Sequence, residues 1–245
     1  MILAGEVLRA METLPFGALA DIGGDRPVLV MAPHADDESL GCGGLIAGLC
    51  RAGTPPMVLV LTDGAGSHPA SAAFPPARLA QVRQDEAREA VRRLGLPPDR
   101  IHFAGQRDTA APTDGPAFDA AVDGVSALCR TFGIGTLLAP WRHDPHCDHE
   151  AADLLARAVA DRLTLRHLSY PVWGWTLPAD HPLPELPNGL RLDISRDLPA
   201  KTEAIMAHRS QYGGLITDDP TGFTLPAELL RLFERPYETF LVPGR

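Results

Sequence analysis

The sequence predicts an α/β protein with a Rossmann-like three-layer fold, in which helices cover both faces of a mostly parallel sheet. Short apolar runs alternate with helical stretches between residues 27 and 163. The runs are almost continuously apolar, which is typical of parallel strands buried on both faces. Their regular alternation with helices indicates repeated βαβ units. Polar clusters follow the first and fourth runs, at the sheet edge where such folds bind ligands.

The elements can be assigned in chain order. The first apolar run, PVLVMA at 27–32, predicts a strand, and a glycine-rich helix is expected through 43–53. MVLVLT at 57–62 predicts the second strand, followed by an amphipathic helix over 77–96. The remaining expected elements are strands at 101–105, 135–141 and 190–194 and helices at 118–133, 148–163 and 198–212.

The length of 245 residues is consistent with a single domain spanning 1–245. From about residue 167 the pattern loosens, and we expect this part to form a variable substrate-pocket region. Residues 171–188 are dense in proline, glycine and tryptophan, which predicts a loop that forms one wall of a pocket. A second proline- and alanine-rich loop is expected at 67–78.

Composition narrows the classes of function. The net charge of −9 argues against nucleic acid as a partner, because phosphate backbones bind clustered Lys and Arg. No apolar stretch approaches the ~18 to 20 residues of a membrane span. The N-terminal stretch lacks a basic region before an apolar run, so a secretory signal is not predicted. A cytoplasmic protein with reduced thiols is expected, because its cysteines show no CxxC spacing: Cys42, Cys50, Cys129 and Cys147.

The stretch MAPHADDESLGCGG, residues 31–44, gathers His34, Asp36, Asp37 and Glu38 at the carboxyl end of the first predicted strand. The glycines lack dinucleotide-binding spacing, and the acids would repel a pyrophosphate. Acids at this position favour a cation. Glu38 is interpreted as an acid that complements the dipole at the helix start.

The fourth strand ends in a second cluster, APWRHDPHCDHEAA, which contains His143, Asp144, His146, Asp148 and His149. Both clusters are expected at the same edge of the sheet. Zinc accepts nitrogen and oxygen ligands, and a catalytic zinc site uses three protein ligands and leaves a position open. The roles of His143 and Asp144 stay open, with support of the loop or of a ligand favoured over metal binding.

PHADDE and HCDH together resemble the paired motifs of the PIG-L/LmbE-like zinc-dependent deacetylases. LTDGAGS, RQDEAREAVRRLG, RDT and KTEAIMAHRSQ also resemble family features, and the resemblance covers roughly residues 25–212. Two prolines of the family pattern are replaced here, by Ala35 and Cys147, and the tyrosine that some members carry ahead of HCDH is absent.

The resemblance implies one Zn²⁺ per chain, held by His34, Asp37 and His149, with Fe²⁺ or another divalent ion as an alternative. An unstrained acetamide needs a strong nucleophile and charge stabilisation on its carbonyl oxygen, and a metal helps to supply both. The departing nitrogen also needs a proton, which a side-chain acid can donate.

By the same resemblance, Asp36 matches the general base, and His146 matches the residue that stabilises the oxyanion and protonates the leaving amine. Asp148 matches the orienting partner of His146, which would keep that imidazole protonated. Arg83 and Asp108 match sugar-binding positions. For Arg83 the ordinary alternative is an exposed ion pair with Glu86, three residues away on the same helix face.

The predicted function is removal of an acetyl group from an N-acetylated amino sugar or sugar conjugate of the N-acetylglucosamine type. The partner is then a small molecule. Alternatives are a zinc amidase acting on another N-acyl compound, such as an antibiotic precursor, and a metal-dependent binding protein without turnover. Trp173 and Trp175 are candidates either for the core or for a face on which a sugar stacks. The sequence leaves open whether the chain forms a homo-oligomer.

Overall fold

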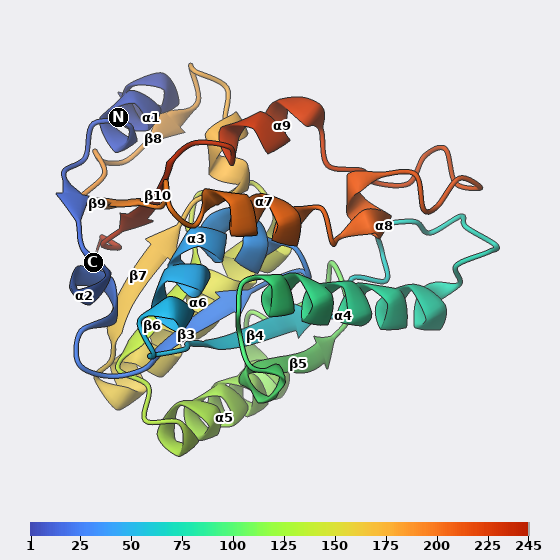
Figure 1. The fold of residues 1–245 in the computed structure, drawn as a ribbon, viewed down its shortest axis with the longest axis horizontal. Coiled ribbons are helices and arrows are strands. Elements are labelled where there is room, and N and C mark those ends of the chain that lie inside the picture. Colours follow the sequence, from blue (N-terminus) through green and yellow to red (C-terminus); the bar gives the residue numbers. More distant parts are fainter. Residues whose placement is uncertain (245) are drawn as a thin grey trace.

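A single large sheet forms the centre of the molecule. The computed structural model describes residues 1–244. Within them, eight strands form this sheet (Figure 1). In order across the sheet the strands are β2 (Phe16–Gly17), β9 (Gly189–Asp193), β10 (Tyr237–Leu241), β7 (Arg166–Tyr170), β6 (Thr136–Pro140), β3 (Val28–Ala32), β4 (Met57–Thr62) and β5 (Ile101–Gln106).

The strands that carry the sequence pattern are parallel. From β7 through β6, β3 and β4 to β5, each neighbouring pair runs in the same direction. β10 is antiparallel to both β7 and β9. The predicted α/β class with a mostly parallel sheet is therefore confirmed. A separate two-stranded ladder joins β1 (Ile2–Leu3) to β8 (Pro182–Leu183).

Helices pack on both faces of the sheet, which gives the three layers that the sequence predicted (Figure 1). None of the helices within residues 1–244 is long and apolar enough to cross a membrane. The α-helices are α1 (Ala4–Met11), α2 (Leu19–Gly23), α3 (Asp37–Arg51), α4 (Pro76–Arg93), α5 (Gly115–Thr131), α6 (Cys147–Leu163), α7 (Leu198–Ile205), α8 (Arg209–Tyr212) and α9 (Ala227–Leu232), and the 3-10 turns are η1 (Pro98–Arg100) and η2 (Trp173–Thr176).

Alternate residues of the central strands enter two different cores. Val28 and Val30 of β3 pack with buried residues of α3, α4 and α7. Leu29 and Met31 point to the opposite face and pack with α5 and α6. Because side chains alternate along a strand and both faces are buried, these strands read as continuous apolar runs.

The order of the strands reverses next to β3. The chain passes from β3 to β4 and β5 on one side, and later to β6 and β7 on the other. β3 and β6 are therefore adjacent although a long stretch of chain separates them. In open α/β sheets, ligands bind at such a switch point, outside the carboxyl ends of the strands. The two loops that follow β3 and β6 lie at this point.

Helix α3 leaves the first of these loops in close contact with its neighbours. A Cβ at Gly41 would overlap the ring of Tyr170, and a Cβ at Gly43 would lie 2.9 Å from Lys201 Cγ. The Tyr170 hydroxyl donates to the Met31 carbonyl at 2.7 Å. The glycine-rich stretch therefore serves close helix packing, and no dinucleotide signature is needed to explain it.

The region beyond residue 163 contains regular elements that the sequence did not predict. β7 lies partly within the segment described as loosening, and β10 is a short strand near the C-terminus. β10 is buried along most of its length because it lies between two other strands, a tertiary arrangement that local periodicity does not reveal. Residues 171–188 are largely irregular, as predicted, apart from η2 and β8.

The predicted helix over 198–212 is interrupted. α7 ends at Ile205, and α8 begins at Arg209. His208 lies between them with φ −78° and ψ 58°, outside the helical region, and its side chain is buried. The break directs His208 toward α3, where it meets Glu38.

His167 on β7 makes stability depend on pH. Burial and the charge of Arg157 lower the pKa of its imidazole to about 4, below that of an unfolded histidine. The unfolded state therefore binds more protons, so this residue's contribution is present above pH ~6.5 and is lost as pH falls toward ~4. We expect His167→Phe to reduce the stability lost between pH 7 and pH 5 by about 2 kcal/mol.

Urea unfolding at the two pH values measures this difference. The exposed His181, replaced by glutamine, serves as the matched control and should leave the pH dependence unchanged. An unchanged dependence in His167→Phe would show that this imidazole is protonated equally in the folded and unfolded states.

Candidate active site

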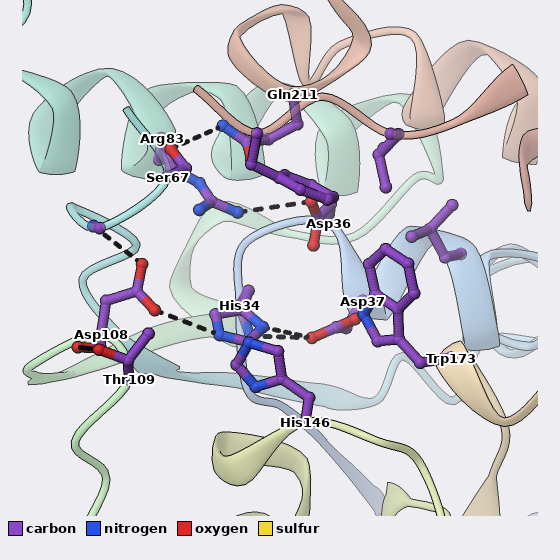
Figure 2. A pocket seen from close by; sticks show the side chains of 14 residues that line it. His34, Asp36, Asp37, Ser67, Arg83, Asp108, Thr109, His146, Trp173 and Gln211 are labelled. Atoms are coloured by element: carbon purple, nitrogen blue, oxygen red, sulfur yellow. Dashed lines mark hydrogen bonds and ion pairs between the residues drawn. The ribbon is translucent and has the colours of Figure 1, made fainter. Parts of the chain in front are cut away.

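The loops after β3 and β6 bring the two predicted clusters together at the sheet edge. His34 and Asp36 lie in the first loop and Asp37 begins α3, while His146 caps the start of α6. Figure 2 shows His34, Asp36, Asp37 and His146 around one pocket. His149 lies in the first turn of α6, close to the His34 and His146 rings.

The three predicted metal ligands converge on one another. Asp37 Oδ2 lies 3.2 Å from His34 Nδ1 and 3.3 Å from His149 Nε2. His146 is close by, because one ring nitrogen from each of His34, His146 and His149 lies within 4.8 Å of the others. His34, Asp37 and His149 are all buried. The group of His34, His146 and His149 could hold a metal ion, and Asp37 lies against two of its members.

Charges in this cluster depend strongly on one another. Burial opposes protonation of His149, but the Asp37 charge and the hydrogen bond to Asp144 outweigh it and raise the pKa to about 9. The pKa of His34 is also raised, because hydrogen bonds to Asp108, Asp148 and Asp37 outweigh burial. Burial alone would raise the pKa of Asp37, yet His149 and His34 hold it well below its usual range. A group of buried carboxylates thus attracts positive charge.

Asp144 fixes the orientation of His149. Its Oδ2 accepts a hydrogen bond from His149 Nδ1 at 3.0 Å. The other ring nitrogen, Nε2, is buried and has no hydrogen-bond partner within the described residues. With Nδ1 donating to Asp144, Nε2 is the nitrogen that could bind a cation in place of the proton that it carries beside Asp37. The donor set of nitrogen and carboxylate oxygen therefore fits a metal such as zinc.

Asp144 also organises the wall of the pocket. The same Oδ2 accepts the backbone N–H groups of Val172 and Trp173, each at 3.0 Å, and Oδ1 accepts that of Gly174 at 2.7 Å. A single buried carboxylate therefore joins His149 to the turn η2 that carries Trp173. The sequence left the role of Asp144 open, and the structure places it in support of both a histidine and the loop.

Asp36 lies beside the cluster in a strained backbone conformation, with φ 153° and ψ −30°. Its Oδ2 is 3.4 Å from Arg83 Nη2. Burial raises the pKa of Asp36 to about 6, although the charge of Arg83 opposes this shift. The carboxylate faces the pocket (Figure 2).

His146 and Asp148 interact differently from the expectation. His146 Nδ1 accepts the backbone N–H of Asp148 at 3.2 Å, whereas the Asp148 carboxylate lies 3.1 Å from His34 Nε2. That carboxylate also accepts the N–H groups of Thr109 and Ala111. Burial and the charges of His34 and His149 lower the pKa of His146, although Asp148 raises it. Asp148 therefore orients the His146 ring through its backbone, and the upward effect of its carboxylate on the pKa of that ring is smaller than the downward effects of burial and the neighbouring histidines.

The two predicted sugar-binding residues both line the pocket. Asp108 is buried, accepts the N–H of Gly66 at 2.9 Å and lies 3.4 Å from His34. Arg83 is also buried, and its guanidinium donates to the carbonyls of Gly64 and Ala35. Part of its donor capacity is thus used to support the loop.

The exposed ion pair considered as the alternative for Arg83 is not formed. Glu86 instead accepts two hydrogen bonds from Ser210, from its N–H at 2.8 Å and its hydroxyl at 2.6 Å. Both side chains therefore connect α4 to other segments, and α4 contributes to the site through Arg83.

Several pocket residues were not identified from sequence. The cavity, about 220 Å³ in volume, has a polar wall that includes Ser67 and Gln211. Gln211 Nε2 donates to Ser67 Oγ at 3.2 Å, which joins α8 to the loop after β4 (Figure 2). Trp173, one of two candidates for a stacking face, lines the cavity with Phe223. The motif HRSQ could have indicated Gln211, but Phe223 lies in a segment without a recognisable pattern.

Solved structures share this architecture. N,N'-diacetylchitobiose deacetylase from Pyrococcus horikoshii, solved with its inhibitor MPG, is similar over 97% of this chain and 90% of its own, with a TM-score of 0.64 and 20% identity. The conserved protein TT1542 from Thermus thermophilus is similar over 89% of this chain and 95% of its own, with a TM-score of 0.64 and 26% identity. The zinc-inhibited form of teicoplanin deacetylase Orf2 is similar over 77% of this chain and 87% of its own, with a TM-score of 0.61 and 17% identity.

Sequence comparison identifies the family. No curated protein is significantly similar to this chain. The model of the PIG-L family, described as GlcNAc-PI de-N-acetylase, matches residues 29–160. These residues include both loops of the site and more than half of the chain, and the protein therefore belongs to the PIG-L family.

Proposed function

We propose that this protein is a metal-dependent N-deacetylase, a hydrolase that removes an acetyl group from an N-acetylated amino sugar or sugar conjugate of the N-acetylglucosamine type. The observation that carries the proposal is the convergence of His34, Asp37 and His149, of which His34 and Asp37 line one cavity together with Asp36 and His146. A protein that only binds its ligand would not require a potential base and a potential acid next to the metal-binding residues.

His34, Asp37 and His149 would hold one divalent ion, for which we propose zinc. When bound, this ion polarises the carbonyl of the substrate and makes water a better nucleophile at neutral pH. The buried Nε2 of His149 supports this assignment, because it makes no hydrogen bond within the described residues, faces Asp37, and belongs to a ring that Asp144 orients. Reloading stripped protein with Zn²⁺ or Fe²⁺ and comparing the activities identifies the more effective ion.

The chain's own groups then divide the proton transfers. Asp36 accepts the proton of the attacking water, for which a carboxylate with a pKa of about 6 is suited near neutral pH. His146 lies on the other side of the cavity, where its ring donates to the oxygen that gains charge and passes a proton to the leaving nitrogen. Asp148 holds both His146, through its N–H, and His34, through its carboxylate.

The cavity suits a small amphipathic ring. Its volume of about 220 Å³ accommodates one sugar residue next to the proposed metal ligands. Trp173 and Phe223 both line the cavity, and their rings are in contact edge to face with centroids 5.7 Å apart. Together they form an apolar wall. Asp108 and Gln211 lie on the polar side, where they would accept or donate hydrogen bonds to hydroxyl groups.

Amine release from N-acetylglucosamine, N,N'-diacetylchitobiose and several N-acyl amino acids tests the proposal. We expect zinc-dependent release from the sugars and none from the amino acid derivatives. Release only from non-sugar N-acyl compounds would support a different zinc amidase, and tight metal binding without any release would support a binding protein.

Asp144→Asn is expected to lower metal affinity by about 10- to 100-fold, because the amide places a donor against either His149 or the backbone N–H groups of η2. Competition with a chromogenic chelator measures the affinity. Asp180→Asn, at an exposed position, is the matched control and should bind the ion as the wild type does. Equal affinities in Asp144→Asn and the wild type would remove Asp144 from this role.

A further inference from the structure

Glu38 is a fully buried acid that the proposed proton transfers do not use. Its side chain is 0% exposed, and its carboxylate makes contacts in two directions. Oε2 accepts the backbone N–H of Asp36 at 3.0 Å. Oε1 accepts the Ser39 hydroxyl at 2.7 Å and lies 3.0 Å from His208 Nε2. Glu38 therefore connects the loop of Asp36 to the break between α7 and α8.

The N–H that Glu38 binds belongs to a residue under backbone strain. The φ of 153° at Asp36 lies in a region that residues with a Cβ rarely adopt, and such conformations cost about 1–3 kcal/mol each. They persist only where the surrounding structure enforces them. Around Asp36, the contacts to Glu38 and from Arg83 to the Ala35 carbonyl supply this constraint.

His208 fixes Glu38 in turn. Its imidazole is 1% exposed and comes from the unpredicted break between α7 and α8, so it approaches α3 from outside the loop. Glu38 lies in the first turn of α3, and its side chain could adopt several rotamers there. The helix alone therefore does not determine the direction of its carboxylate. The contact with His208 directs one oxygen away from the loop and leaves the other against the Asp36 N–H.

We propose that Glu38, anchored by His208, is a positioning residue that holds Asp36 in its strained backbone conformation and so aims the Asp36 carboxylate into the cavity. This inference rests on the proposed function for the role of Asp36, but the strain itself does not. It replaces the interpretation of Glu38 as a residue that only complements the helix dipole.

A thermal comparison of two variants tests the strain independently of turnover. Glycine adopts positive φ readily, whereas alanine does not, so Asp36→Gly should melt about 2 to 8 °C above Asp36→Ala in the full-length protein. In ordinary helical positions the order is reversed. Metal content is measured for each variant, so that a difference in bound ion is not mistaken for strain.

The same comparison in a Glu38→Met background tests the positioning role. Methionine keeps the length of the side chain but accepts no strong hydrogen bond, so the advantage of glycine over alanine should fall below about 1 °C as the loop relaxes. Glu38→Gln keeps an acceptor for the Asp36 N–H and should preserve the full difference.

Glu150→Met is the matched control, since Glu150 is an exposed acid in the first turn of α6. An equal difference in the wild-type and Glu38→Met backgrounds would overturn the proposal. If Glu38→Met does not fold, Glu38→Ala removes the same acceptor.

Kinetics provide the second test. Glu38→Met should lower kcat on the order of 100-fold with KM and metal content nearly unchanged, because the base is displaced and the pocket is intact. In an Asp36→Asn background the same change should lower kcat less than about twofold, since no base is left to position. Equal losses in both backgrounds would assign Glu38 a general structural role. If no acetamide is cleaved by the wild type, the proposed function fails, while the thermal comparison still decides whether Glu38 enforces the strain.

Discussion

Asp36→Asn is expected to lower kcat by about 10²- to 10⁴-fold, the range that a general base contributes. Asparagine has nearly the same shape as aspartate and keeps the loop in place, but its amide cannot accept the proton of the attacking water. KM and the amount of bound metal should change little, because Asp36 is not among the three ligands that we propose. Steady-state kinetics on the best substrate of the panel, with metal analysis of the same samples, measures the effect.

The control for this substitution is Asp119→Asn, an equal chemical change at an exposed position of α5. It should leave kcat unchanged. A loss of less than about tenfold in Asp36→Asn would mean that another group takes the proton, and a loss of bound metal would mean that Asp36 belongs to the ligand set.

Removal of the metal is expected to have the second large effect. A chelator should abolish amine release, and one equivalent of zinc should restore it. The ion should also stabilise the fold, because it binds the native cluster and compensates the charge of the buried Asp37 carboxylate, which His149 and His34 otherwise offset. At free metal concentrations near 1,000 times Kd this stabilisation is about 4 kcal/mol. Thermal melting with and without the ion measures it.

His149→Ala should lose both the turnover and the stabilisation by metal, since it removes the nitrogen that Asp144 orients. His181→Ala, at an exposed position, is the matched control and should behave as the wild type does. A His149→Ala variant that still melts higher with zinc would show that the ion binds through other residues, such as His34 with Asp108 and Asp148.

The part of the fold that carries the site could be predicted because two local signals agreed. The runs at 27–32 and 135–141 are apolar on both faces, which only strands in the middle of a covered sheet require. The polar clusters follow these runs directly, so the positions of His34 and His149 at one sheet edge followed from the class of fold. For this part of the site, the local sequence pattern was sufficient to predict the tertiary arrangement.

The rest of the site depends on contacts between segments that are distant in sequence. Glu38 could be read only as a helix-start acid, because its partner His208 comes from the break between α7 and α8. The position of Asp144 between His149 and η2 likewise requires knowledge of how the loop at 171–176 folds back. β10 was missed because its burial comes from lying between β7 and β9 rather than from its own pattern.

The site at the switch point between β3 and β6 is built from two groups of residues that can vary independently in sequence. The groups to which we assign the hydrolytic chemistry come from loops that follow adjacent parallel strands, whereas Trp173, Gln211 and Phe223 line the pocket from segments outside those strands. Changes in these outer segments can therefore alter the recognised molecule while the reactive centre is inherited intact. A library confined to 171–176 and 211–225 is the natural starting point for redirecting the enzyme to new acylated amines, with Asp144 kept constant because it belongs to both parts.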